Sequence, residues 1–512
     1  MEKDLPVENI RPTQGMTIKV FKGSFWVLTG QVLPLIATFV STPFIIRYLG
    51  AESYGVLILV GLISGYFSFA DFGMGLASTR FASEAFAKAD KKEEGLVVRT
   101  AAVIAFLSSL IIAIPMFLFS NLLVHNILHV PVNLQTKANI ALKITSFTFL
   151  FSILGNIFNS PQLSRMRMDI NVLITSGSKV LMILITPLVL YMGGGIVEAT
   201  IVAFFAALII MGGNIIASGL LLPELYRSTI SRSLLRPLIK FGSNVLLWGI
   251  AVAVLANLEK LILTRVISVK SLAYYSVAFT LANMTTMLSM SIVQALIPAF
   301  SQLQAPEKRT ELNTLFSRSI RFSLAGLLPS IIFLLIIAKP FFTIWAGPEF
   351  GKESIFPFYF LLVGIFFSII VYVPNCVLTG FGRADIFARV YWIEMLPYIV
   401  IAFLLIHLFG IWGAAISWSL REIFNALLFV FFSKKYTGVS FSILKQFRDF
   451  IPGIIILLPV TFFALFYNNY SFWLISFIPV SFGAYIYMVW KKIMIHEEKV
   501  WVIGYIRRFL KK

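Results

Sequence analysis

The chain has 512 residues, of which 59% are hydrophobic and only 13% are charged, and its mean hydropathy is +0.90. This composition excludes a soluble globular protein, because soluble domains carry about 25% charged residues. A run of about 20 apolar residues crosses the hydrocarbon of a bilayer as one helix. We therefore predict an all-α polytopic membrane protein.

Apolar runs of helical length, bounded by charged and turn residues, predict fourteen membrane-spanning helices. In chain order they are 23–46, 54–78, 100–124, 139–160, 170–192, 196–220, 241–263, 272–297, 320–341, 354–378, 390–409, 411–432, 450–467 and 471–490. Tight turns between consecutive helices are predicted at Gly193–Gly195, Gly410 and Asn468–Tyr470.

The basic residues that give the chain its net charge of +19 are distributed according to the predicted topology. With the N-terminus placed in the cytoplasm, 32 of the 42 Lys and Arg residues fall on the cytoplasmic side, and the excess recurs in every alternate loop. By the positive-inside rule, this pattern predicts an even number of spans with both termini in the cytoplasm.

An internal repeat links the two halves of the chain. Arg47–Ser53 recurs in outline as Arg265–Ser271, at the same place relative to the predicted spans. This predicts two parallel six-helix lobes related by a pseudo-two-fold axis, a transporter arrangement whose substrate site lies between the halves. The predicted parts are a cytoplasmic N-terminal segment (1–22), an N-lobe (23–220), a cytoplasmic linker (221–240), a C-lobe (241–432), two further spans with their preceding loop (433–490) and a basic cytoplasmic tail (491–512).

Several kinds of chemistry lack support in the sequence. The single cysteine, Cys376, excludes an intramolecular disulfide, and the four histidines have no zinc-ligand spacing. The predicted outer loops are short, there is no Asp-x-Asp pair, and Gly177–Lys179 lacks the glycine spacing of a nucleotide-binding loop. We predict a protein that is not an enzyme, has no cofactor or metal and binds no nucleic acid.

Two cations are predicted deep within spans. Lys179 and Arg421 lie about ten residues from either end of their spans, where a charge costs roughly 2.5–3.5 kcal/mol, so each is a candidate functional residue. The alternatives are internal ion pairs. Lys179 would then pair with Asp71 or Glu394, and Arg421 with Glu422 or with carbonyl groups of a neighbouring helix.

Other polar residues extend this candidate site. Asp71 belongs to a polar face predicted along 54–78. Glu259 and Lys260 form either an interfacial pair or part of the site, and Arg47 and Arg265 are either headgroup anchors or cations at a cavity rim. Polar faces pack helices together or line a hydrated cavity, and a cavity rich in cations suits a phosphate or diphosphate. The candidate substrate-binding residues are Lys179, Arg421, Asp71, Arg47, Glu259, Lys260 and Arg265.

Short motifs carry a family resemblance. Arg47–Gly55 (RYLGAESYG) and Asp71–Gly75 (DFGMG), followed by Thr79–Phe81 (TRF), resemble the first helical pair of bacterial polysaccharide flippases. These are the Wzx-type oligosaccharide exporters of the multidrug/oligosaccharidyl-lipid/polysaccharide superfamily. Glu259–Leu263 (EKLIL) and Ala273–Ala278 (AYYSVA) resemble helices seven and eight of that family, in which the acid is more often Asp.

The resemblance implies a flippase of the bacterial plasma (inner) membrane that moves polyprenyl-diphosphate-linked oligosaccharide to the outer leaflet by alternating access, for surface polysaccharide assembly. It also implies coupling to a proton or sodium gradient, and partners among membrane lipids and the polysaccharide polymerase and ligase machinery. The last two spans would contact the lipid tail. Two alternatives remain: an ion-coupled multidrug exporter with an acid-dominated pocket, and a membrane-embedded glycan-processing enzyme.

Overall fold

The computed structural model describes residues 12–286, 296–383, 385–439, 443–466, 472–494 and 499. The chain divides into two compact units, Met1–Ala273 and Tyr274–Lys512. Outside the described residues lie the predicted turn at Asn468–Tyr470, the first eleven residues and nearly all of the basic tail after Met494.

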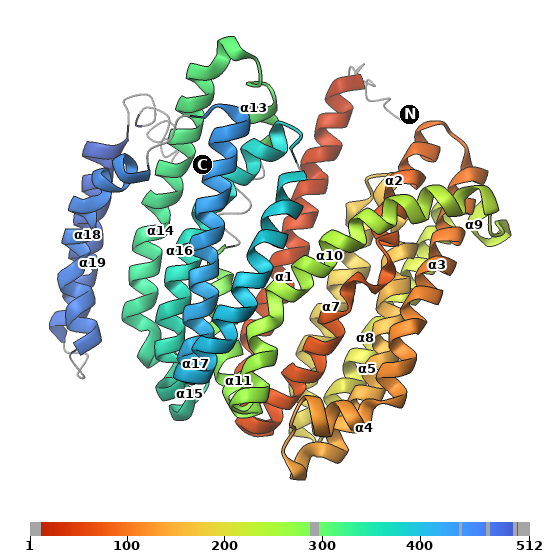
Figure 1. Cartoon of the computed structure of the whole chain (residues 1–512), viewed down its shortest axis with the longest axis horizontal. Helices are drawn as coiled ribbons and strands as arrows, with labels where there is room; N and C mark the ends of the chain where they lie inside the picture. Colours follow the sequence, from red (N-terminus) through yellow and green to blue (C-terminus); the bar gives the residue numbers. More distant parts are fainter. Residues whose placement is uncertain are drawn as a thin grey trace, which may run out of the picture. The chain divides into compact units, whose positions relative to one another are not determined.

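The first unit is built from helices (Figure 1). In chain order these are α1 (Pro12–Tyr66), the 3-10 turn η1 (Ser68–Asp71), α2 (Met74–Ala87), α3 (Lys91–Leu118), α4 (Ser120–Leu122), the π-helical turn η2 (Leu123–Ile127), α5 (Val132–Phe158), α6 (Ser160–Ser164), α7 (Met168–Tyr191), α8 (Ile196–Leu221), α9 (Glu224–Arg227) and α10 (Arg232–Val266). Helix α11 (Val269–Met284) begins at the end of this unit.

The second unit continues with further helices (Figure 1). They are α13 (Ile297–Ser301), the 3-10 turn η3 (Pro306–Lys308), α14 (Arg309–Trp345), α15 (Pro348–Glu353), α16 (Ile355–Gly380), α17 (Asp385–Thr437), α18 (Ile443–Phe466), α19 (Phe472–Met488) and the π-helical turn η4 (Val489–Ile493).

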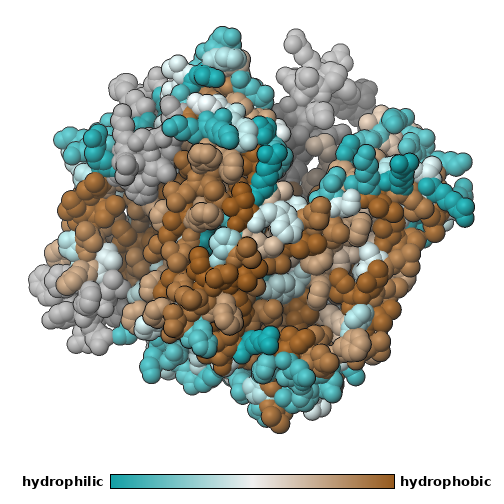
Figure 2. All heavy atoms as spheres, viewed as in Figure 1, coloured by the Kyte–Doolittle hydropathy of each residue, from teal (hydrophilic) through white to brown (hydrophobic). Residues whose placement is uncertain are grey.

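The lengths of the helices confirm the predicted all-α membrane fold. Among the described residues, nine helices are long and apolar enough to cross a bilayer. Two of them have double length and bend at Gly50 (φ 75°) and Gly410 (φ 57°). Helix α17 holds two of the predicted spans, and α1 holds the first span and the beginning of the second. Helices α11, α18 and α19 occupy the remaining three. Figure 2 shows apolar side chains gathered along the middle of the helices and polar ones toward their ends.

The span predicted over 54–78 is not one continuous helix. It breaks after Tyr66, and Phe72 (φ 55°) and Gly73 (φ 68°) take left-handed backbone angles that a helix cannot continue through. The Asp71 carboxylate accepts hydrogen bonds from the backbone N–H groups of Gly73 (2.8 Å) and Gly75 (3.0 Å). Unpaired backbone groups are costly inside a bilayer, so this local cap makes the break tolerable.

This break packs closely on α10. A Cβ atom added to Gly242 would lie 2.3 Å from the carbonyl oxygen of Phe72, and one added to Gly73 would lie 2.7 Å from Cβ of Val245. Only glycine therefore permits the two backbones to approach this closely. The contact joins the start of α2 to the first half of α10 within the first unit.

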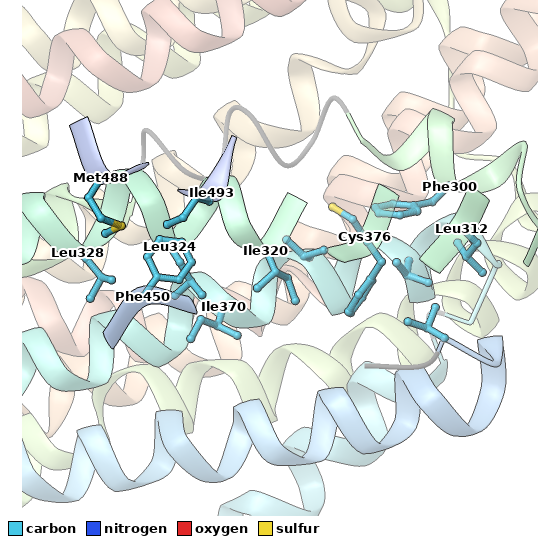
Figure 3. Close-up of a cluster of buried hydrophobic side chains, with 14 of the residues drawn as sticks. Phe300, Leu312, Ile320, Leu324, Leu328, Ile370, Cys376, Phe450, Met488 and Ile493 are labelled. Atoms are coloured by element: carbon cyan, nitrogen blue, oxygen red, sulfur yellow. The ribbon is translucent and has the colours of Figure 1, made fainter. Parts of the chain in front are cut away.

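In the second unit, a buried apolar cluster joins α18 and α19 to α14 and α16. Figure 3 shows Met488 and Ile493 beside Leu324, Leu328 and Phe450 at one end of this cluster. Cys376 of α16 is buried in the same cluster, which explains its place in an apolar span.

We expect Gly242→Ala to destabilise the protein by about 1–3 kcal/mol, because its methyl group would force α10 away from the break. Gly61→Ala is the matched control, since Gly61 is an exposed helical glycine with open space around the added Cβ. The control should be neutral or slightly stabilising. Thermal unfolding of both purified variants in detergent checks this; equal midpoints would contradict the close contact.

Candidate functional site

Lys179 lies midway along α7, and its side chain is exposed within the first unit. Val172, two turns earlier on the same face of α7, packs where a Cβ added to Gly30 of α1 would lie, 2.9 Å away. Lys179 is therefore on the side of α7 that borders α1. In the described part of the chain it has no ion-pair or hydrogen-bond partner.

Helix α7 is also the least covered of the nine apolar helices: only 6% of its most apolar stretch is buried. The hydroxyl groups of Thr175 and Thr186 donate to carbonyl groups one turn earlier in the same helix. They are therefore already partly satisfied, and Lys179 is the group on α7 with the most donors to offer a ligand.

The alternative partners of Lys179 are engaged elsewhere. Both carboxylate oxygens of Asp71 cap the start of α2, as described above. Glu394 belongs to the second unit, where the Asn425 amide donates to it at 2.6 Å.

Three other charged groups inside the first unit have compensating contacts. Glu94 is fully buried, and Arg165 forms a two-pronged ion pair with it, one prong of which is 2.9 Å long. The Arg165 guanidinium also lies 4.7 Å from the centre of the Phe86 ring. Lys143, a second lysine within a span, has its ammonium 5.5 Å from the centre of the Phe117 ring. This contrast sets Lys179 apart.

Arg421 is largely buried in α17, with 13% of its side chain exposed, and pairs with Glu422. Its guanidinium lies 5.2 Å from the centre of the Tyr398 ring and 5.9 Å from that of Trp418. The internal pair with Glu422, which the sequence left open as an alternative, is therefore present.

A second acid completes this cluster. Glu394 is 1% exposed and lies within electrostatic range of both Arg421 and Glu422. With all three groups ionised, the cluster of Glu394, Arg421 and Glu422 carries one positive and two negative charges. Sequence reasoning named Glu394 only as a partner for Lys179 and missed Tyr398.

The signal that would have found these neighbours is the bend at Gly410. The two halves of α17 meet at this glycine, so residues at nearly equal distances from it along the chain face each other. Glu394 and Asn425 are one such pair, and Tyr398 and Arg421 are another, one helical turn nearer the bend.

The remaining candidates are spread along the first unit. Glu259 of α10 is fully buried and lies within electrostatic range of Tyr66 of α1. The Lys260 ammonium donates to the side chain of Asn257 at 3.1 Å, within its own helix. Arg47 and Arg265 are exposed, and no hydrogen bond or ion pair between described residues joins either to Lys179.

A metal-binding arrangement is not found in the part of the chain that the structure describes. No three His, Cys, Asp or Glu side chains come together there in a way that would hold an ion.

We expect Arg421→Met to destabilise the protein by about 3–5 kcal/mol, because it leaves Glu422 and Glu394 buried without their cation. Glu422→Gln should cost less, because Glu394 still compensates Arg421. The matched control is Lys352→Met, which removes the cation of an exposed neighbouring pair with Glu353 and should cost about 1 kcal/mol or less. Thermal unfolding of the purified variants measures these differences; equal losses for the two buried positions would contradict a three-residue cluster.

Residues 20–304 match the family described as polysaccharide biosynthesis protein. The chain is 23% identical over 420 residues to a candidate O-antigen transporter of Shigella flexneri. The matched region covers 80% of this chain and 97% of that protein.

Two solved structures have a similar fold. The lipid II flippase MurJ, in an inward closed conformation, has a TM-score of 0.70 at 15% identity and covers 91% of this chain and 98% of that chain. An inward-facing multidrug resistance transporter of the MATE family has a TM-score of 0.64 at 15% identity and covers 80% and 94%.

These likenesses confirm the predicted fold class, fourteen helices with two six-helix lobes and two C-terminal spans. The family match covers more than half of the chain and agrees with the flippase motifs at Arg47–Gly55 and Asp71–Gly75. The chain therefore belongs to the polysaccharide biosynthesis protein family.

Proposed function

We propose that the protein is a flippase that moves polyprenyl-diphosphate-linked oligosaccharide from the cytoplasmic to the outer leaflet by alternating access, for surface polysaccharide assembly. The observation that carries this proposal is Lys179, a cation halfway along a membrane-spanning helix with no acidic partner among the described residues. The family, and the name of the Shigella flexneri relative, support it.

That cation is costly to place inside the bilayer. A charge in the middle of a span is tolerated when it faces water or an opposite charge. Because Lys179 is exposed on the least covered helix, we infer that this face of α7 meets water and the anionic cargo. A lipid-linked diphosphate brings negative charge and several acceptor oxygens, and a lysine ammonium binds phosphate as a compact charge with three donors. We infer that Lys179 contacts the diphosphate during its passage.

The same proposal includes the setting of transport. The positive-inside pattern supports cytoplasmic N- and C-termini in the bacterial inner membrane. We infer that the chain hands its cargo to polymerase and ligase enzymes and catalyses no covalent step itself. Turnover of a nucleotide sugar by the purified protein would contradict this part.

We expect Lys179→Gln to lower the flipping rate roughly tenfold or more, since a hydrogen bond to a charged group contributes about 1.5–3 kcal/mol. Lys179→Arg, which keeps the charge, should retain more activity than the glutamine variant. The matched control is Lys143→Gln, because Lys143 also lies within a span but rests on the Phe117 ring. Its rate should equal that of the wild type.

The measurement uses proteoliposomes and a defined polyprenyl-diphosphate saccharide, with flipping read from accessibility of the sugar on each side. Thermal unfolding midpoints verify that each variant is folded. A wild-type rate for Lys179→Gln would remove this residue from the mechanism. Unchanged surface polysaccharide after gene deletion, in a strain with no redundant flippase, would overturn the function as a whole.

We propose further that a proton or sodium gradient drives transport through the cluster of Glu394, Arg421 and Glu422. Arg421 balances only one of the two acids, so the other can exchange a cation. Asn425 donates to Glu394 and holds its carboxylate in place. Binding and release of one positive charge would then change the net charge of the cluster in each transport cycle.

Imposed gradients in proteoliposomes test this coupling. The wild-type rate should rise with an inwardly directed proton or sodium gradient, and the ion that accelerates flipping is the coupling ion. Glu394→Gln should abolish the acceleration while leaving basal flipping in place. Glu353→Gln, at an exposed acid in the same unit, is the control and should respond as the wild type does. An undiminished response of Glu394→Gln would exclude Glu394 as the coupling acid.

A second candidate function is export of lipophilic cations, which the excess of acid at Glu394 and Glu422 favours. The two functions differ in their dependence on Lys179. Loss of that positive charge should impair passage of a diphosphate but leave passage of a cation unchanged or faster. Efflux of a fluorescent lipophilic cation by the wild type and by Lys179→Gln distinguishes them.

A further inference from the structure

The second unit contains a cavity of about 330 Å³ between α14 and the turn η4 that follows α19. Arg318 and Arg321 of α14 line it at one end, and Phe322 and Ala325 continue the lining along the same helix. Val489 and Ile493 of η4 form the opposite wall. None of these residues belongs to the transport site proposed above.

The order of the lining residues on α14 gives the cavity a polar and an apolar part. Arg318, Arg321, Phe322 and Ala325 are spaced by three and four residues, so they share one face of the helix. The two arginines lie nearer the start of the helix, and the apolar residues follow toward the middle of the span. A site with cations at the membrane surface and an apolar wall below has the shape of a lipid.

The charge of the cavity is positive. Its described lining includes two arginines and no acidic side chain. Arg321 has no ion pair or hydrogen bond with any described residue, and the exposed Lys491 and Lys492 lie in the adjoining turn η4. Basic pockets between membrane helices at the cytoplasmic side bind anionic lipid headgroups, and the positive-inside pattern predicts that side here.

The apolar wall of the cavity is fixed by a hydrogen bond and leaves room for an acyl chain. The Tyr485 hydroxyl of α19 donates to the carbonyl oxygen of Ala325 at 3.1 Å, which fixes α19 against α14 beside the cavity. Ile493 belongs to the buried cluster of Figure 3. Gly326, which also lines the cavity, has nothing within 4 Å of an added Cβ.

We propose that this cavity binds an anionic phospholipid of the surrounding bilayer. The phosphate contacts Arg318 and Arg321, and the first part of an acyl chain lies against Ala325, Val489 and Ile493. Arginine suits this role because its planar guanidinium can donate two parallel hydrogen bonds to one phosphate. The bound lipid would bridge α14 and the C-terminal end of α19. This inference requires only that the chain spans a membrane, and does not depend on the cargo proposed above.

Two variants test the two parts of the site separately. Arg321→Gln removes a phosphate contact, and we expect roughly fivefold weaker binding of phosphatidylglycerol from the loss of one basic residue. Gly326→Leu fills open space beside the chain without changing any charge, and it too should weaken binding. Lys308→Gln is the charge-matched control, because Lys308 is exposed near the same end of α14 but does not line the cavity. It should bind as the wild type does.

Binding is measured on delipidated full-length protein in detergent by native mass spectrometry, with phosphatidylglycerol, neutral phosphatidylcholine, a polyprenyl phosphate and inorganic phosphate as ligands. Unchanged unfolding midpoints without lipid verify that the variants are folded. The proposal is supported if the wild type prefers phosphatidylglycerol to phosphatidylcholine, both variants bind phosphatidylglycerol more weakly, and the control binds it as the wild type does.

Three results would overturn it. Equal phosphatidylglycerol binding by Arg321→Gln and Lys308→Gln would remove the arginine contact. Displacement of the lipid by inorganic phosphate at equal concentration would show a simple anion site, in which the acyl chain contributes nothing to binding. Tighter retention of the polyprenyl phosphate than of phosphatidylglycerol would assign the cavity to the carrier lipid instead of the bilayer. Because the readout is lipid binding, a failure here leaves the flipping experiments unaffected.

Discussion

The compensation of charge inside an apolar protein is the constraint on which the rest of this structure depends. Several charged groups within the helices have contacts that compensate their charge. Arg165 neutralises the fully buried Glu94, Arg421 pairs with Glu422 between two aromatic rings, and Lys143 rests on the Phe117 ring. Lys179 has no such answer among the described residues, although it lies on a helix of the same length and apolar character. An uncompensated cation at this depth is stable only where water or an anion reaches it. In the proposed function, the least covered helix of the first unit would therefore be the place where a negatively charged cargo is most stabilised.

The same demand for satisfied polar groups governs the backbone. A helix can break within the bilayer only if the exposed N–H groups find acceptors, and after this break the Asp71 side chain accepts from the N–H groups of Gly73 and Gly75. The broken segment then brings its carbonyl groups against Gly242 of α10, where no side chain intervenes. One carboxylate therefore has a structural role here. It lets the chain change direction, and it allows α2 and α10 to pack in direct backbone contact with no side chain between them. This role accounts for the acid in the DFGMG motif without assigning it to a substrate.

The sequence predicts much of the fold, because the span positions depend on apolar composition and on turn residues that act locally. Gly410 illustrates this: its left-handed conformation produces the bend that the sequence places there. The break after Tyr66 was not predicted, because Ser64, Ser68, Asp71, Gly75 and Ser78 have the spacing of one polar helical face. The period alone cannot show that Asp71 turns back onto its own backbone.

Lys179 and Arg421 were found through the cost of burying a charge, but that cost does not say whether a partner is near. Their different outcomes depend on which helix packs opposite, and only three-dimensional placement supplies that.

The two units use their internal charges differently, and this difference bears on how transport would work. In the first unit the mid-span lysine is left with donors to spare. In the second, one arginine pairs with Glu422 within electrostatic range of Glu394, and its charge is more than balanced. A cation that is already paired is a poor primary contact for a diphosphate, because the ligand must compete with carboxylates a few ångströms away. An acid that shares its cation with another acid is well suited to bind and release a proton or a metal ion. Attraction of cargo and response to a gradient would then reside in different lobes, so a single protonation event could change the balance of the second lobe without removing the charge that holds the cargo in the first.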